Sequence, residues 1–145
     1  MGDTRTPEAV EISSMATILL VEDDDAVRAV VARMLEEQGF ELLVASGSDE
    51  ALEHCNAHGE QIDLVLSDLV MPRTSGEELV ANLRRRFPRL RVLFMSGYLD
   101  STLASVAHVY GEHGRVELLG PGTHLLRKPF TKDQLADAVQ QALAP

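Results

Sequence analysis

Residues 18–28 read ILLVEDDDAVR, and this stretch decides the fold. Its first four residues are all apolar, which is typical of a strand buried on both faces in a parallel sheet. Four acidic residues follow directly, and the apolar side chains then recur at helical spacing. The stretch therefore predicts a buried strand, an acidic loop, and a helix that either Asp24 or Asp25 caps.

The same alternation of strand and helix patterns continues to the end of the chain. Short apolar runs predict further strands at residues 40–45, 64–66, 92–95 and 125–126. Helical spacing predicts four more helices, which contain Leu52, Leu79, Leu103 and Leu135. Strands that alternate with helices indicate βαβ units, so we expect an α/β fold with a doubly wound, five-stranded parallel sheet and five helices.

Several residues predict where these helices begin and end. Gly39 is placed to close the first helix, and Ser46 and Ser48 are candidate caps of the second. Residues 74–77 and 131–134 resemble capping boxes, in which a hydroxyl and a carboxylate or amide side chain bind two free backbone amides.

The composition indicates one domain and disfavours several classes of protein. The 145 residues suit a single domain, which we assign to residues 16–145, with residues 1–15 as a flexible tail or linker. A net charge of −10 disfavours nucleic-acid binding, and no apolar run approaches the ~20 residues of a membrane span. One cysteine and a start without a signal-peptide pattern favour a reducing, cytoplasmic setting.

Polar residues follow four of the predicted strands, where a parallel sheet brings its functional residues to one edge. These residues are Glu22, Asp23, Asp68, Ser96 and Lys128. Carboxylates held close together repel unless a cation lies between them, and oxygen ligands at an open site suit Mg²⁺. With a lysine and a hydroxyl nearby, the set predicts phosphoryl transfer onto an aspartate at an exposed rim.

Four segments together resemble the receiver domain of two-component response regulators. They cover most of residues 16–145 in the family's order: ILLVEDDDAVR (18–28), DLVLSDLVMPRTSG (63–76), LFMSG (93–97) and LLRKPF (125–130). The resemblance implies a flavodoxin-like sheet with strand order 2-1-3-4-5. It also implies a signalling domain that catalyses only its own phosphorylation and dephosphorylation, and is otherwise no enzyme.

The resemblance also implies roles for individual residues. Asp68 would accept the phosphoryl group, while Asp23, Asp68 and the backbone carbonyl of Val70 would bind Mg²⁺, with Glu22 acting directly or through water. Ser96 would bind one phosphoryl oxygen. The phosphoryl donor would be a histidine kinase or a histidine phosphotransfer domain.

By the same resemblance, Lys128 would bind a second phosphoryl oxygen. Lysine is rare here, since 11 of the 13 basic residues are arginine, and a compact ammonium suits this position better than a planar guanidinium. The peptide bond from Lys128 to Pro129 is a candidate for the cis form.

Two features depart from the family's pattern. Leu125 stands where receivers usually carry an aromatic residue or a histidine, which argues against a switch that buries a ring. The segment between Ser96 and Lys128 is longer than usual, and its start, FMSGY at residues 94–98, resembles the receivers at the C-terminus of hybrid histidine kinases.

Two other functions stay open at this point. A phosphohydrolase with an aspartate nucleophile would need a second aspartate where this chain has Val70, and a pseudo-receiver would only bind proteins.

The spacing of His54, Cys55 and His58 could form one side of a metal site, but a solvated helix face is the simpler interpretation. The arginines between residues 84 and 91 are interpreted in the same way, with a docking patch for an acidic partner as the alternative.

Overall fold

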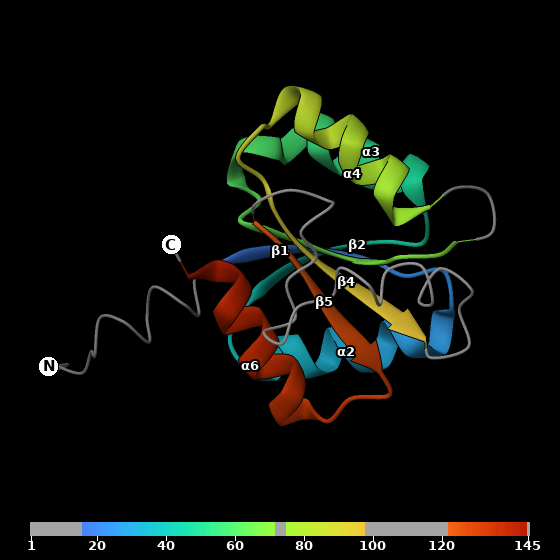
Figure 1. The fold of residues 1–145 in the computed structure, drawn as a ribbon, viewed down its shortest axis with the longest axis vertical. Helices are drawn as coiled ribbons and strands as arrows, with labels where there is room; N and C mark the ends of the chain where they lie inside the picture. The colour runs from blue at the N-terminus through green and yellow to red at the C-terminus, as the bar shows by residue number, and fades with distance from the viewer. Residues whose placement is uncertain (1–15, 72–74, 98–121, 145) are drawn as a thin grey trace, which may run out of the picture.

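The apolar runs form five parallel strands of one sheet, in the order β2-β1-β3-β4-β5. The computed structural model describes residues 16–71, 75–97 and 122–144. The predicted fold class and strand order are thereby confirmed (Figure 1). The strands are β1 (Thr17–Val21), β2 (Glu41–Ala45), β3 (Leu64–Asp68), β4 (Arg91–Gly97) and β5 (Thr123–Lys128).

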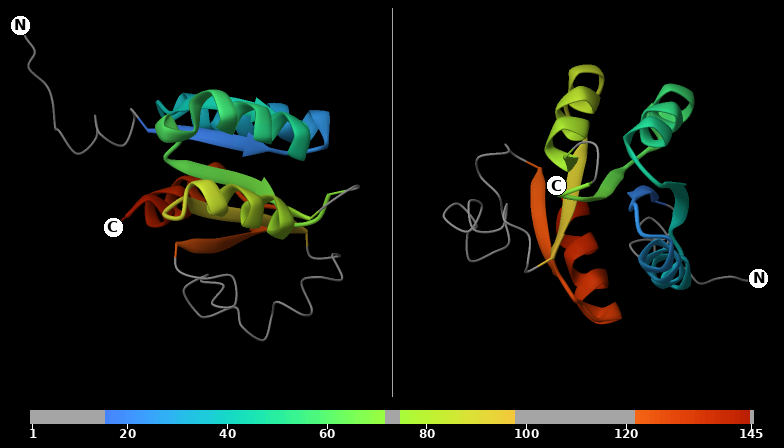
Figure 2. Two further views of the ribbon diagram at one scale, coloured as in Figure 1. Left: turned by 90° about the horizontal axis from the view of Figure 1, so that it is seen from above. Right: turned by 90° about the vertical axis from the view of Figure 1, so that its right-hand side faces the viewer.

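Helices cover both faces of the sheet. Figures 1 and 2 show α3 and α4 on one face and α2 and α6 on the other. Four of the five predicted helices are found, and the one expected around Leu103 lies outside the described residues. The helices are α2 (Asp25–Glu37), α3 (Ser48–His58), which continues into the short 3-10 turn η1 (Gly59–Gln61), α4 (Gly76–Arg86) and α6 (Lys132–Leu143). None of them is long and apolar enough to span a bilayer.

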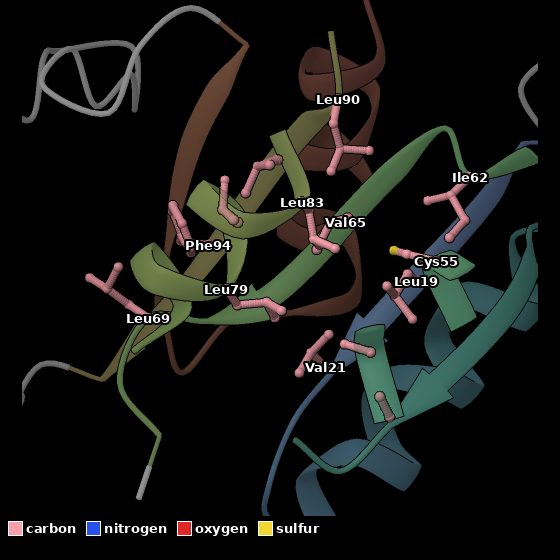
Figure 3. Close-up of a cluster of buried hydrophobic side chains, with 14 of the residues drawn as sticks. Leu19, Val21, Cys55, Ile62, Val65, Leu69, Leu79, Leu83, Leu90 and Phe94 are labelled. Carbon is pink, nitrogen blue, oxygen red and sulfur yellow. The ribbon is translucent and has the colours of Figure 1, made fainter. Parts of the chain in front are cut away.

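The two covered faces explain why the strands lack an alternating pattern. Successive side chains of a strand point to opposite faces, so Leu19 packs beneath α3 and α4 (Figure 3), while Ile18 and Leu20 pack toward α2 and α6. All three side chains are fully buried. An uninterrupted apolar run is therefore the expected pattern for a strand in the centre of this sheet.

Three of the predicted helix ends are confirmed. The carboxylate of Asp24 accepts hydrogen bonds from the amides of Ala26 and Val27 and caps α2. Gly39 follows the end of that helix with a φ of 95°, a conformation that glycine adopts without steric cost. Thr131 and Gln134 form a complete capping box at the start of α6.

Two predicted caps are wrong. The cap of α4 is Ser75, one residue later than expected, and its hydroxyl accepts from the amide of Glu78. At α3 the N-cap is Gly47, which has no side chain to contribute. The hydroxyl of Ser46 does not accept from the helix but donates to the carboxylate of Glu50, as does the Ser46 amide. An ionised carboxylate is a strong acceptor, so it competes for this hydroxyl.

Candidate functional site

The carboxyl ends of β1, β3 and β5 bring together residues that are far apart in the sequence. Glu22 and Asp23 follow β1, while Asp68 and Lys128 are the last residues of β3 and β5. The parallel register pairs Asp68 with Met95 and Gly97 with Lys128, so these ends lie at one edge of the sheet. The predicted convergence of these four residues is therefore seen in the structure.

Three carboxyl groups form the acidic part of the site. Glu22, Asp23 and Asp68 each place an oxygen within 4.8 Å of the other two. Glu22 and Asp68 are buried, whereas Asp23 is exposed to solvent. Asp68 is only 4% exposed, so the expectation of an exposed rim is wrong for this residue. Burial follows from its place at the end of the central strand β3, in contact with the side chain of Lys128.

Lys128 lies between the two buried carboxyl groups. Its Nζ donates to Oε1 of Glu22 at 2.9 Å and to Oδ1 of Asp68 at 2.7 Å. Burial lowers the pKa of Lys128, but the hydrogen bonds and charges of Asp68 and Glu22 outweigh that effect and raise it. The ammonium is therefore charged at neutral pH and is the cation nearest to these carboxyl groups among the described residues.

Asp68 itself is electrostatically unsatisfied. The pKa of Asp68 is raised from 3.8 to about 8, mainly by burial and also by the adjacent carboxyl of Glu22, while Lys128 opposes the rise. Its second oxygen, Oδ2, is buried and has no hydrogen-bond partner among the residues that the structure describes. A buried oxygen without a partner, next to two further carboxyl groups, fits a bound divalent cation.

The backbone beneath Asp68 is held by the start of α4. The amide of Gly76 donates to the carbonyl of Leu69 at 2.8 Å. A Cβ atom at Gly76 would lie 2.2 Å from the carbonyl oxygen of Asp68, so only glycine allows this approach. This contact depends on how α4 packs against the end of β3, so local sequence patterns do not reveal it.

The last two predicted site residues are less directly linked to the carboxyl groups. Ser96 is fully buried and follows Met95, the register partner of Asp68, and its hydroxyl donates to the carbonyl of Gly97 at 3.4 Å. Val70 is 44% exposed and pairs with Ser75 in an isolated antiparallel bridge. The roles expected for these two residues stay predictions.

The His54–Cys55–His58 motif and the arginines between residues 84 and 91 belong to the scaffold. Cys55 is buried in the core, and Nε2 of His54 makes a 2.8 Å hydrogen bond with the carbonyl of Val44. The interpretation of the arginines as merely solvated is wrong for Arg84 and Arg91, which are partly buried, whereas Arg86 is exposed as expected. Arg84 donates to the carbonyls of Leu90 and Gly122, Arg86 to Asn56, and Arg91 to Leu143 and Ala144.

Comparison with known proteins agrees with this geometry. The family model described as "Response regulator receiver domain" matches residues 18–140, which include all of the candidate site. The chain belongs to the response regulator receiver family. As a receiver, it is a module of two-component signal transduction.

Relatives of this receiver include sensor kinases and transcriptional regulators. The sensor kinase CckA of Brucella abortus is 35% identical over 141 residues, which are 97% of this chain and 14% of that protein. The DNA-binding transcriptional regulator NtrC of Azospirillum brasilense is 34% identical over 130 residues, or 90% of this chain and 24% of that protein. The chain thus spans less than a quarter of the length of these two relatives.

Solved structures of receivers have the same fold. The receiver domain from the hybrid histidine kinase CckA is 32% identical, with a TM-score of 0.69 over 89% of this chain and 100% of that one. A receiver domain protein from Clostridium thermocellum is 29% identical, with a TM-score of 0.71 over 89% of this chain and 94% of that one.

Proposed function

We propose that this receiver takes a phosphoryl group from a phosphohistidine onto Asp68 in a Mg²⁺-dependent reaction. One observation carries the proposal. Asp68 is a buried carboxyl group beside two further carboxyl groups; one of its oxygens accepts from Lys128, and the other has no hydrogen-bond partner within residues 16–71, 75–97 and 122–144. The donor would be a histidine kinase or a histidine phosphotransfer domain.

The transfer exchanges one bond to phosphorus for another. An oxygen of the Asp68 carboxylate attacks the phosphorus in line with the P–N bond of the phosphohistidine. The new O–P bond forms as the P–N bond breaks, and the electron pair of that bond returns to the imidazole nitrogen, which takes up a proton. The product is an acyl phosphate on Asp68 and a neutral histidine on the donor.

The residues around Asp68 have distinct tasks in this transfer. Glu22, Asp23, Asp68 and the carbonyl of Val70 would hold Mg²⁺, which supplies positive charge to the transferring phosphoryl oxygens. Cation binding also favours the ionised form of Asp68, which is the nucleophile. Lys128 would move from the carboxyl groups to a phosphoryl oxygen, and the hydroxyl of Ser96 would donate to another.

The geometry favours a signalling receiver over the two alternatives. Val70 offers no acid for the turnover of a phosphohydrolase. The contact of Lys128 with both Glu22 and Asp68 argues against a pseudo-receiver, in which these side chains would have no reaction to support. The free, buried thiol of Cys55 is compatible with a reducing, cytoplasmic compartment.

The similarity to CckA supports a second proposal, which concerns the partner of this receiver. This receiver would exchange phosphoryl groups with a hybrid histidine kinase, either as a module of one or as its separate partner. Phosphotransfer from a panel of purified kinases and phosphotransfer domains would identify the donor as the one with the fastest labelling. Labelling at the same slow rate by every donor would contradict a dedicated partner.

The proposed function is tested by incubation with a small acyl phosphate, with Mg²⁺ and with a chelator. Intact-mass measurement should show one added phosphoryl group with Mg²⁺ and little without it. Asp68→Asn should abolish the addition, whereas Asp49→Asn, a matched change at an exposed helix start, should not. Phosphorylation of the Asp68→Asn variant would refute the assignment, and continuous phosphate release without a stable adduct would indicate a phosphohydrolase.

A further inference from the structure

Arg28 contacts the acidic loop but belongs to none of the roles described so far. It lies in the first turn and a half of α2, and its side chain is 22% exposed. Its Nη1 donates to the backbone carbonyl of Glu22 at 2.9 Å, and its Nη2 donates to Oδ1 of Asp25 at 2.6 Å. One planar guanidinium thus joins the two ends of the loop that contains Asp23.

The three carboxyl groups of the site are held in place by different means. Glu22 is held through its side chain, which accepts from Lys128 and from the amide of Asp24. Asp68 is held by Lys128 and by its position in β3. Asp23 is exposed, so packing does not restrain its side chain, and its position depends on the peptide groups on either side of it.

The contact with Arg28 restrains the first of these peptide groups. The carbonyl of Glu22 belongs to the peptide that ends at the nitrogen of Asp23, so rotation of this peptide would move the Asp23 carboxylate. We propose that Arg28 is a positioning residue for the metal site, which holds this peptide and thereby keeps Asp23 directed at Asp68. The proposal rests on the Mg²⁺ site of the proposed function.

Charge and position make opposite predictions for the loss of Arg28. Its guanidinium is a positive charge close to a cation site, so its removal would strengthen Mg²⁺ binding if only charge mattered. If Arg28 positions Asp23, its removal weakens binding, since partners that orient metal ligands typically contribute about 10- to 100-fold in affinity. The sign of the change therefore separates the two effects.

The test is calorimetric titration with Mg²⁺ alone of the wild type and three variants. Arg28→Met should weaken binding roughly tenfold. Arg28→Lys should give a smaller loss, because an ammonium can reach one of the two oxygens but does not reproduce the planar pair of donors. Arg33→Met removes the same charge from an 82% exposed position on the same helix, and its affinity should equal that of the wild type.

Amide hydrogen exchange distinguishes positioning from a general loss of stability. In Arg28→Met, faster exchange should be confined to residues 22–25, with the amides of β3 unchanged. Equal or tighter Mg²⁺ binding by both Arg28 variants would overturn the proposal and leave the phosphoacceptor function intact. Absence of Mg²⁺ binding by the wild type would instead refute the proposed function, and the role of Arg28 with it.

Discussion

Asp68→Asn should stabilise the metal-free protein, and the gain should increase with pH. The pKa of Asp68 is about 8 in the folded protein and 3.8 in an unperturbed carboxyl group. Between these pH values the folded state holds one proton more than the unfolded state, so the stability of the wild type falls as pH rises. An asparagine has no proton to lose, and the variant therefore lacks this decrease.

The expected size follows from the same two pKa values. One extra bound proton makes the free energy of unfolding fall by ~1.4 kcal/mol per pH unit, or about 4 kcal/mol between pH 5 and pH 8. We expect about half of this, roughly 2 kcal/mol, because water and the partly exposed Lys128 ammonium can rearrange around the ionised carboxylate. Below pH 4 the Asp68 carboxyl is protonated in the folded and the unfolded state, so the gain in stability of Asp68→Asn over the wild type should vanish.

Urea unfolding followed by circular dichroism measures this difference. The wild type and Asp68→Asn would be compared at pH 5, 6, 7 and 8 in the presence of a chelator, with Asp49→Asn as a control for the loss of one exposed carboxyl group. Saturating Mg²⁺ should reverse the order, because it stabilises the carboxylate form by mass action. A difference between Asp68→Asn and wild type that stays constant across this pH range would refute the reasoning.

Three further changes test other contacts of the site. Asp23→Ala should remove most of the rise in melting temperature that Mg²⁺ produces, and an unchanged rise would exclude Asp23 as a ligand. Lys128→Met should cost about 3 kcal/mol of metal-free stability, because it leaves two buried carboxyl groups without their cation; urea unfolding that shows no loss would contradict this. Gly76→Ala should destabilise the protein by about 2 kcal/mol and slow the phosphorylation of Asp68, because its Cβ would meet the Asp68 carbonyl. Gly47→Ala is the matched control, since no atom lies within 4 Å of its Cβ, and equal effects of the two changes would contradict the contact.

Local patterns in the sequence determined much of the fold. The apolar run at Ile18 to Val21 predicted a doubly covered strand, because only a strand with helices on both faces buries successive side chains. Asp24 and Thr131 were recognisable as caps, since their partners lie two or three residues away. Parallel strands bring their carboxyl ends to one edge of the sheet. The residues of the acidic site could therefore be predicted, because Glu22 and Asp23 follow β1 and Asp68 ends β3.

Contacts between distant residues decided the rest. Glu22 and Lys128 are 106 positions apart, and the placement of the ammonium between two buried carboxyl groups depends on how the strands pack. That packing buries Asp68, raises its pKa and leaves one of its oxygens without a hydrogen-bond partner in the described part of the chain. Three arginines that resembled a solvated patch are bound to carbonyl or amide oxygens for the same reason. A periodic pattern records which face of an element is buried, but burial and hydrogen bonding of a polar group depend on atoms from other elements, and only the tertiary structure brings these together.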